Sequence, residues 1–329
     1  MEELKLLLES CRSEETKKTY AYGLQKYFAF VGGEGQLPKG TKEIESKIIE
    51  YIIYLKKEGM SYQGISNYIV PIKSFYAIND VTLNVKKIAK FMPENRKVKT
   101  DRSYEHEEIS KLLSIADERM RVVILVLASS GIRIGALPLI RLRNLQDSKL
   151  TVYEKDVEEY FTFVTPECKQ AIDFYLDMRS RYGEKLNDNS FLIREQFDVR
   201  SRVPARPKSV DKSALQYKLY DLCNRSGIDK EKTAIAHSFR YFFTKQLVES
   251  KVNPEIREML LGHKIGLASA YYRPTEEEMY AEYEKAIDNL TINEENRLRK
   301  KVEKLEVDKL EYEALAADIA RIKKKVKID

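Results

Sequence analysis

The feature that most constrains the fold is a break in the apolar pattern near residue 93 of this 329-residue chain. Before the break, apolar residues recur at the spacing of helices that bury one face. Ser13 is typical of a helix start, Gly32 of a helix end, and Pro71 predicts a bend. The predicted helices are 13–31, 41–57, one that starts after Met60 and a short one near 83–91. We therefore expect an all-helical domain over residues 1–93.

The break itself is the segment Pro93–Arg102, PENRKVKTDR, which is polar and basic and lacks apolar periodicity. It predicts an interdomain linker at 94–102. Arg96, Lys97 and Lys99 are candidates for contacts with phosphates, and solvated linker charges are the alternative. The net charge of +6 is modest, so it makes a polyanionic partner plausible without establishing one.

The second domain is predicted over residues 103–289, and most of it is helical. Ser103 is a candidate N-cap, and a very apolar segment from Met120 to Ser130 predicts a buried helix. The other predicted elements are a helix carrying Ile132, Ala136, Leu137 and Ile140, strands at 149–153 and 160–164, helices at about 167–180, 212–226, 238–250 and 254–261, and a short strand at 190–193. The expected fold class is mainly α with a small β-hairpin or sheet.

Residues 290–329 have a heptad pattern of their own. Thr291 and Glu294 have the spacing of a capping box. The apolar positions that follow are Leu298, Leu305, Tyr312, Ile319 and Val326, widened by Val302, Leu315 and Ile322. This pattern predicts a long C-terminal helix that forms a coiled coil or docks on a partner, and a helix lying on its own domain is the alternative.

Several classes of protein are disfavoured. The chain has no run of about 18 apolar residues, so we expect no membrane-spanning helix, and its first residues do not suit a signal peptide. Cys11, Cys168 and Cys223 form no CxxC pair, which argues against a disulfide framework or a zinc site. We expect a cytoplasmic protein with no metal, cofactor, membrane or small-molecule partner.

Three short motifs carry the candidate chemistry. The first, Ser129-Ser130-Gly131-Ile132-Arg133, places an arginine just after the buried helix. The second is His237-Ser238-Phe239-Arg240, in which residues three apart share a helix face. The third is Leu261-Gly262-His263, with Tyr272 nine residues beyond the histidine. Each motif alone has an ordinary structural explanation, such as a cap, a surface charge or a core tyrosine.

In this order and spacing, the three motifs resemble those of the tyrosine recombinases, or phage-type integrases, including archaeal and archaeal-virus members. The family's Thr-Gly-Leu-Arg core is matched by Ser130 to Arg133, its His-x-x-Arg by His237 and Arg240, and its Leu-Gly-His by His263. Its lysine lies on a β-hairpin about two dozen residues after the first arginine, where Lys155 stands. The resemblance spans nearly the whole chain and implies a helical DNA-binding domain, a linker and a catalytic domain.

The resemblance also implies a role for each matched residue. Tyr272 would attack a phosphodiester and form a 3′-phosphotyrosyl bond, while Arg133 and Arg240 would bind the phosphate oxygens. His237 would be the general base, His263 a hydrogen-bond donor to the phosphate, and Lys155 the general acid. These roles suit the chemistry, because guanidinium groups match phosphate oxygens and a tyrosine hydroxyl needs help to lose its proton.

The implied partner is double-stranded DNA that carries attachment sites, bound by a homotetramer on two sites. The implied function is the integration or excision of a mobile element in the nucleoid of a prokaryotic host. A second basic segment, Arg200–Lys208, offers Arg202, Arg206 and Lys208 as candidate phosphate contacts, and a solvated loop is the alternative.

Two departures from the family pattern leave rival interpretations open. The family's acidic residue three positions after the first arginine is replaced by Ala136, and the hairpin lacks the usual glycine-rich turn around Lys155. Tyr271 is a rival nucleophile beside Tyr272. The alternative functions are DNA relaxation like that of a type IB topoisomerase, and DNA binding without catalysis.

Overall fold

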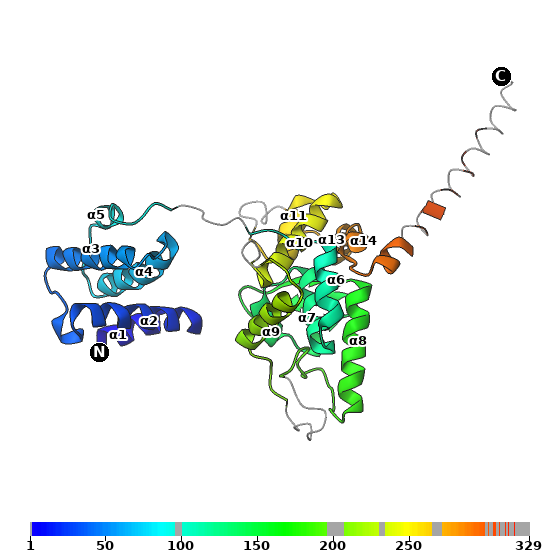
Figure 1. The fold of residues 1–329 in the computed structure, drawn as a ribbon, viewed down its shortest axis with the longest axis horizontal. Helices are drawn as coiled ribbons and strands as arrows, with labels where there is room; N and C mark the ends of the chain where they lie inside the picture. Colours follow the sequence, from blue (N-terminus) through cyan, green and yellow to red (C-terminus); the bar gives the residue numbers. More distant parts are fainter. Residues whose placement is uncertain are drawn as a thin grey trace. The chain divides into compact units, whose positions relative to one another are not determined.

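The computed structural model describes residues 2–95, 101–195, 207–229, 234–264 and 272–299, together with separate helical positions between 302 and 319. Within these ranges the protein is mainly α-helical with a small antiparallel sheet, which confirms the predicted fold class. The chain divides into two compact units, Met1–Lys99 and Thr100–Asp329, each with its own core (Figure 1). In the described part of the chain, no helix is long and apolar enough to cross a membrane.

The N-terminal unit is a helical bundle. Its elements are α1 (Glu2–Ser10), α2 (Glu14–Val31), the 3-10 turn η1 (Glu34–Gln36), α3 (Thr41–Lys57), α4 (Tyr62–Ile78) and α5 (Val85–Ala89). Ser13 caps α2 by accepting a hydrogen bond from the Thr16 backbone N–H at 3.1 Å. A Cβ atom at Gly23 would lie 3.3 Å from Cγ of Pro71, so this glycine lets α2 and α4 approach closely. The N-terminal helix α1 was not predicted.

The C-terminal unit surrounds a central helix. Its helices are α6 (His106–Ile115), α7 (Glu118–Ser130), α8 (Pro166–Arg181), α9 (Lys212–Arg225), α10 (Ala236–Glu249), α11 (Pro254–Leu260), α13 (Glu276–Glu284) and α14 (Ile287–Leu290), with 3-10 turns η2 (Ile134–Leu139) and η3 (Leu142–Asn144). The predicted buried helix is α7, whose residues are buried from Arg119 to Ser130 except at Arg121. It packs against α6, α8 and α10 and leads directly into the first motif (Figure 1).

The small sheet has the strand order β1-β2-β3, with β1 (Leu145–Gln146), β2 (Lys149–Val152) and β3 (Tyr160–Phe163). The two predicted strands, β2 and β3, form an antiparallel hairpin in which Leu150 faces Thr162 and Val152 faces Tyr160. The two-residue strand β1 was not predicted. The hairpin places Lys155 in the turn between β2 and β3, as expected.

Three predicted elements differ from the structure. The segment carrying Ile132 to Ile140 is not an α-helix but the 3-10 turn η2, because Pro138 removes an N–H donor and clashes with the preceding helical turn. Ser103 does not cap α6, which instead starts after Glu105 in a capping box with Glu108. The expected strand at 190–193 is reduced to one bridge between Phe191 and Arg141.

A buried charge cluster lies beside α8. The Glu184 carboxylate accepts hydrogen bonds from Nη2 of Arg179 at 2.6 Å and from Nη1 of Arg194 at 2.9 Å. Both arginine side chains are fully buried and Glu184 nearly so. Glu184 therefore links the end of α8 to the chain segment that follows Phe191.

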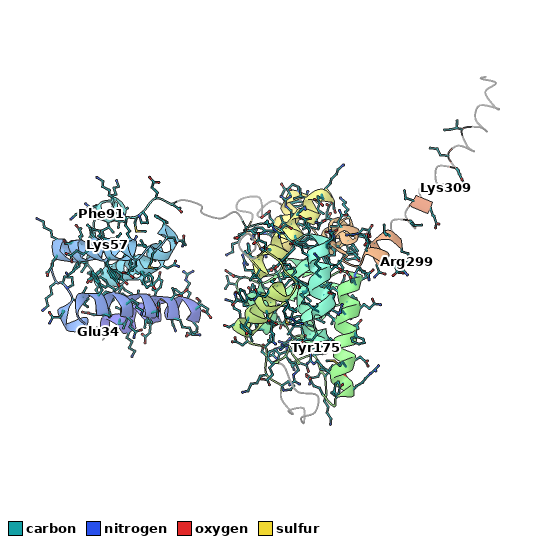
Figure 2. All side chains as sticks on the ribbon, viewed as in Figure 1. Glu34, Lys57, Phe91, Tyr175, Arg299 and Lys309 are labelled. Atoms are coloured by element: carbon teal, nitrogen blue, oxygen red, sulfur yellow. The ribbon has the colours of Figure 1, made fainter. Side chains whose placement is uncertain are left out.

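The C-terminal segment is helical at residues 294–299 and at the described positions between 302 and 319. Figure 2 labels Arg299 and Lys309 on it. Its described apolar residues, Leu298, Val302, Leu305, Leu315 and Ile319, are all exposed. Tyr312, Ile322 and Val326 lie outside the described residues. The helical state agrees with the sequence, and the coiled coil stays a prediction.

Candidate functional site

Arg240 is the residue through which the three motifs meet. It lies on α10 with only 5% of its surface exposed. Its Nη1 donates to the Gly131 carbonyl at 2.7 Å, and its Nη2 donates to the Leu261 carbonyl at 2.5 Å. One guanidinium group therefore joins the arginine motif after α7, the His-x-x-Arg motif of α10 and the Leu-Gly-His motif after α11.

Two glycines allow this close approach. Gly131 ends α7 in the left-handed conformation with φ 62°, and a Cβ atom there would collide with the Phe243 ring. Gly262 has φ 68°, and a Cβ atom there would collide with the Tyr160 ring. Both positions favour glycine on conformational and steric grounds, so the Gly-x-Arg and Gly-His pairs of the sequence have a local physical cause.

His263 completes the hydrogen-bonded part of the site. Its Nε2 lies 2.8 Å from Nη2 of Arg240, and its Nδ1 lies 2.6 Å from Oε2 of Glu258. Glu258, on α11, was not among the predicted residues. The only sequence signal for it is its position five residues before His263, which by itself looks like a surface carboxylate on a short helix.

His237 lies at the exposed rim, one helical turn before Arg240. Its ring packs edge-on against Tyr241, with the centroids 4.8 Å apart. Burial lowers the pKa of His237, and the positive charges of Arg240 and Arg133 lower it further, against the opposing charge of Asp101. The imidazole is thus held in its neutral form to lower pH than a free histidine, as a general base requires.

Tyr160 on β3 belongs to the same electrostatic environment. Burial raises the pKa of its hydroxyl, and the Arg240 and Arg133 guanidinium groups oppose that rise. The same two arginines act on His237. Arg133 and Arg240 therefore influence one shared region, which is positively charged and suited to a phosphate.

Arg133 itself is exposed and stands as the N-cap residue of η2. Its side chain makes no hydrogen bond or ion pair with another residue in the described ranges. Ala136, at the family's acidic position, is fully buried. Among the described residues, no carboxylate is paired with Arg133, so the acidic partner of the family pattern is not replaced by another described side chain.

Among the described residues, no hydrogen bond or ion pair joins Lys155 or Tyr272 to this cluster. Lys155 lies in the hairpin turn with φ 65°, where its backbone N–H donates to Glu159. Tyr272 is 37% exposed, and its side chain makes no bond with another described residue. Tyr271 and residues 265–270 lie outside the described residues. The structure thus places five predicted site residues on one unit with Tyr272 but brings only Arg240 and His263 into direct contact.

Most of the predicted DNA contacts lie outside the described residues, namely Arg96, Lys97, Lys99, Arg202 and Arg206. Lys208 is described and exposed. Its carbonyl accepts a hydrogen bond from the Glu195 N–H at 3.0 Å, and the next residue, Ser209, forms a bridge with Arg194. The chain on the two sides of residues 196–207 is therefore paired, at Arg194 and Glu195 on one side and at Lys208 and Ser209 on the other.

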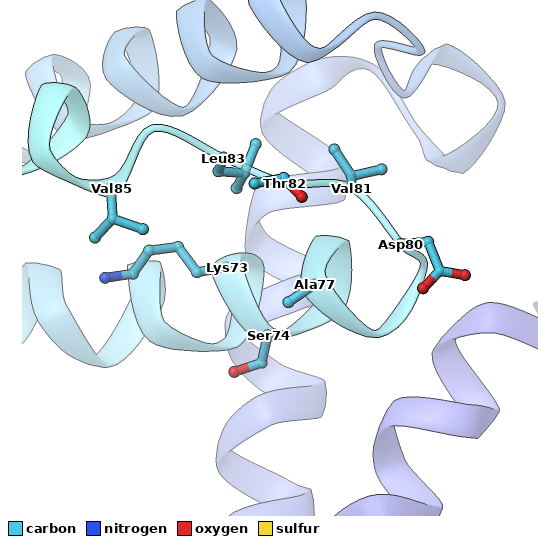
Figure 3. Close-up of a pocket in the computed structure, with 8 residues that line it drawn as sticks. All are labelled: Lys73, Ser74, Ala77, Asp80, Val81, Thr82, Leu83 and Val85. Atoms are coloured by element: carbon cyan, nitrogen blue, oxygen red, sulfur yellow. The ribbon is translucent and has the colours of Figure 1, made fainter.

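A pocket of about 550 Å³ lies on the N-terminal unit (Figure 3). Its lining includes Lys73, Ser74 and Asp80, and none of the predicted site residues. Over the described residues, no group of three or more histidine, cysteine, aspartate or glutamate side chains is placed to hold a metal ion. The arginine and histidine cluster around Arg240 is the candidate active site, because the three motifs meet there.

Comparison with known proteins decides the family. The model of the phage integrase family matches residues 102–278, more than half of the chain and all of the described cluster. The chain belongs to the phage integrase family. This membership confirms the predicted tyrosine recombinase family and, with it, the prediction of a site-specific DNA recombinase.

Relatives of this integrase-family protein include two bacterial recombinases. Tyrosine recombinase XerC of Leptospira interrogans is 26% identical over 296 residues, which cover 85% of this chain and 90% of XerC. Tyrosine recombinase XerD of Listeria innocua is 20% identical over 269 residues, which cover 78% of this chain and 87% of XerD. The similarity therefore includes the N-terminal unit as well as the catalytic one.

Solved structures share the fold at lower identity. A lambda integrase dimer bound to a COC′ core site has a TM-score of 0.59 and 16% identity, and the match covers 83% of this chain and 93% of that one. XerH recombinase bound to its difH substrate has a TM-score of 0.55 and 17% identity, and the match covers 78% and 75%. These likenesses establish the recombinase fold of this chain.

Proposed function

We propose that this recombinase cuts and rejoins double-stranded DNA through a 3′-phosphotyrosyl bond at Tyr272. The observation that carries the proposal is the junction at Arg240, where one guanidinium group holds three motifs together through Gly131, Leu261 and His263. Such a preorganised cation can bind a phosphate without having to be assembled first. DNA as the partner is further supported by the XerH and lambda integrase structures, which contain bound sites.

The chemistry follows from the charge that builds up during cleavage. When the tyrosine oxygen attacks, negative charge increases on the non-bridging oxygens of the phosphate. Arg133 and Arg240 supply planar, permanently charged donors that fit these oxygens, and each such group contributes about 10²–10³-fold to the rate. The 5′ oxygen leaves, and the phosphotyrosyl bond conserves the energy of the broken phosphodiester bond, so rejoining needs no ATP.

Two proton transfers accompany the displacement. The hydroxyl of Tyr272 must lose a proton, and an ordinary tyrosine has a pKa of about 10. We assign His237 as the base, because burial and the nearby arginines keep its imidazole neutral. We assign Lys155 as the acid that protonates the leaving 5′ oxygen, which requires the β2–β3 turn to approach the phosphate when DNA binds.

The biological reaction we propose is integration or excision of a mobile element, by a tetramer on two attachment sites in the nucleoid. An archaeal or archaeal-virus origin stays a prediction from the sequence. The C-terminal helix supports the assembly, because Leu298, Leu305 and Ile319 leave an apolar stripe exposed. The basic segments at 94–102 and 200–208 would contact DNA phosphates.

The test of the nucleophile is covalent trapping. Nicked, end-labelled duplexes that carry candidate attachment sites are incubated with wild type, Tyr272→Phe and Tyr271→Phe, then run on denaturing gels. We expect a protein–DNA adduct that only Tyr272→Phe abolishes. An adduct lost only with Tyr271→Phe would reassign the nucleophile, and no adduct from wild type on DNA that it binds would favour a binding factor without catalysis.

The role of the C-terminal helix is tested by truncation. The cut is placed after Arg299, because Thr291 and Ile292 are buried and Glu167 binds the N–H of Ile292 at 2.7 Å. Removal of residues 300–329 should weaken pairing of two sites more than binding to one site, measured by gel shift. Equal site pairing by the full chain and the truncated chain would contradict the proposed role.

A further inference from the structure

Glu258 occupies a position in the site that the family motifs do not explain. Its carbonyl accepts the backbone N–H of His263 at 2.9 Å, while its carboxylate contacts Nδ1 of the same residue at 2.6 Å. Gly262 makes the reversal between them possible, with φ 68°. Backbone and side-chain bonds thus hold the imidazole against Glu258 on one edge and Arg240 on the other.

This arrangement fixes where the proton of His263 lies. A guanidinium group only donates, so the atom that faces Arg240, Nε2, must accept and be unprotonated. The proton of the neutral imidazole is therefore on Nδ1, where it is donated to Oε2 of Glu258. The carboxylate selects the Nδ1–H form of the ring and points Nε2 at the place where Arg240 would meet a phosphate.

The phosphate-binding role of His263 requires a further proton. To donate to a phosphate oxygen, Nε2 must give up the hydrogen bond that it accepts from Arg240 and take up a proton from solvent. Because Nδ1–H stays on Glu258, the ring becomes an imidazolium. Arg240 brings a second positive charge into contact with Nε2, and His237 and His263 lie close enough to interact electrostatically. Glu258 is the described carboxylate in direct contact with the ring, and its charge also acts on Arg240.

We propose that Glu258 is a positioning residue for strand cleavage, one that orients His263 and stabilises its imidazolium form when the phosphate binds. The proposal rests on the proposed function and on the hydrogen bond from His263 to the phosphate that the family resemblance implies. It extends the site beyond the recognised motifs by one carboxylate, which acts on the phosphate through the His263 imidazole and does not touch the phosphate itself.

The first test determines the tautomer of the His263 ring directly and needs no DNA. The chain has only three histidines, so ¹⁵N-histidine NMR of the full protein gives three rings to assign, with His237→Gln and His263→Gln as references. We expect the neutral His263 ring to be the Nδ1–H form in wild type and in Glu258→Gln, whose amide oxygen still accepts. Glu258→Leu should shift the ring toward the Nε2–H form; an unchanged ring in Glu258→Leu would overturn the orienting role.

The second test measures cleavage of nicked duplex in a single turnover at saturating DNA. Loss of the charge in Glu258→Gln should slow cleavage about 10-fold, at the low end for a charged hydrogen bond because both side chains are partly exposed. Glu255→Gln is the matched control, since Glu255 lies on the same helix, and its side chain makes no bond with another described residue. DNA affinity should change less than the cleavage rate.

A double variant separates positioning from a general structural effect. If Glu258 acts through His263, Glu258→Gln should add no further loss to His263→Gln, whereas independent effects would multiply. Multiplied losses, or full activity of Glu258→Gln beside an active wild type, would refute the proposal. An inactive wild type, or an adduct that survives Tyr272→Phe, would instead refute the proposed function and leave the NMR result standing.

Discussion

Replacement of Gly131 by alanine tests the packing that holds the site together. At φ 62° a non-glycine residue costs about 1–2 kcal/mol, and the new Cβ atom would collide with the buried Phe243 ring. Overpacking of this kind costs about 1–3 kcal/mol more. Gly227→Ala is the matched control, because Gly227 has φ 67° and a Cβ atom added there would have no neighbouring atom within 4 Å.

The difference between the two variants isolates the collision. We expect Gly131→Ala to be about 2 kcal/mol less stable than Gly227→Ala. For a unit of this size, that difference lowers the melting temperature by about 4–8 °C, measured by calorimetry of the full chain. Gly131→Ala should also cleave more slowly than Gly227→Ala, because the Gly131 carbonyl holds Arg240 at 2.7 Å. Phe243→Leu should recover part of the stability in the Gly131→Ala background. Equal melting temperatures for the two alanine variants would refute the packing argument.

Three further outcomes follow from the site and the core. Arg240→Lys should lower the cleavage rate by about 10²-fold or more, because a lysine cannot reproduce the fork that joins Gly131 and Leu261; a loss under about 10-fold in single-turnover assays would contradict this. The pH–rate profile of cleavage should have an acid limb with a pKa below 6.5, since burial and the nearby arginines lower the pKa of His237; a limb above 6.5 would remove it as the base. Glu184→Gln should destabilise the protein by about 3–5 kcal/mol in urea unfolding, because it removes the buried carboxylate charge that both Arg179 and Arg194 bind. Burial opposes ionisation of Glu184, but the two arginines outweigh burial, so the pKa of Glu184 is lowered from 4.5. The stability that ionised Glu184 contributes should therefore be present above about pH 5 and be lost as the pH falls through the lowered pKa of the folded protein.

The sequence predicted the helices well where capping and periodicity agree. Ser13 and Gly32 bound α2 as expected, and the apolar run before Ser130 is the central helix α7. The predictions were wrong where a neighbouring residue changes the local structure. Pro138 limits η2 to a 3-10 turn, and the N-cap of α6 is Glu105, where Ser103 was expected. The strand β1 is two residues long, too short to show alternation.

The site was predictable as a set of residues but not as a network. The spacing of the three motifs indicated which side chains belong together, and no spacing could show that Arg240 binds the carbonyls of Gly131 and Leu261. The acceptors in these hydrogen bonds are backbone carbonyls, which every residue has, so the sequence cannot show which carbonyls are used. Glu258 was missed for a related reason, because a glutamate on an exposed helix face is ordinary until its contact with His263 is seen.

The pairing of Glu195 with Lys208 has a consequence for the length of the chain between them. Glu195 and Lys208 are paired through their backbones, and Arg194 is anchored to Glu184 in the buried charge cluster. Because the ends already meet, doubling the length of the intervening chain costs only about 0.6 kcal/mol in closure entropy. A change in the length of this stretch should therefore alter the stability of the C-terminal unit little, because the buried pair of Arg194 and Glu184 holds the chain before it.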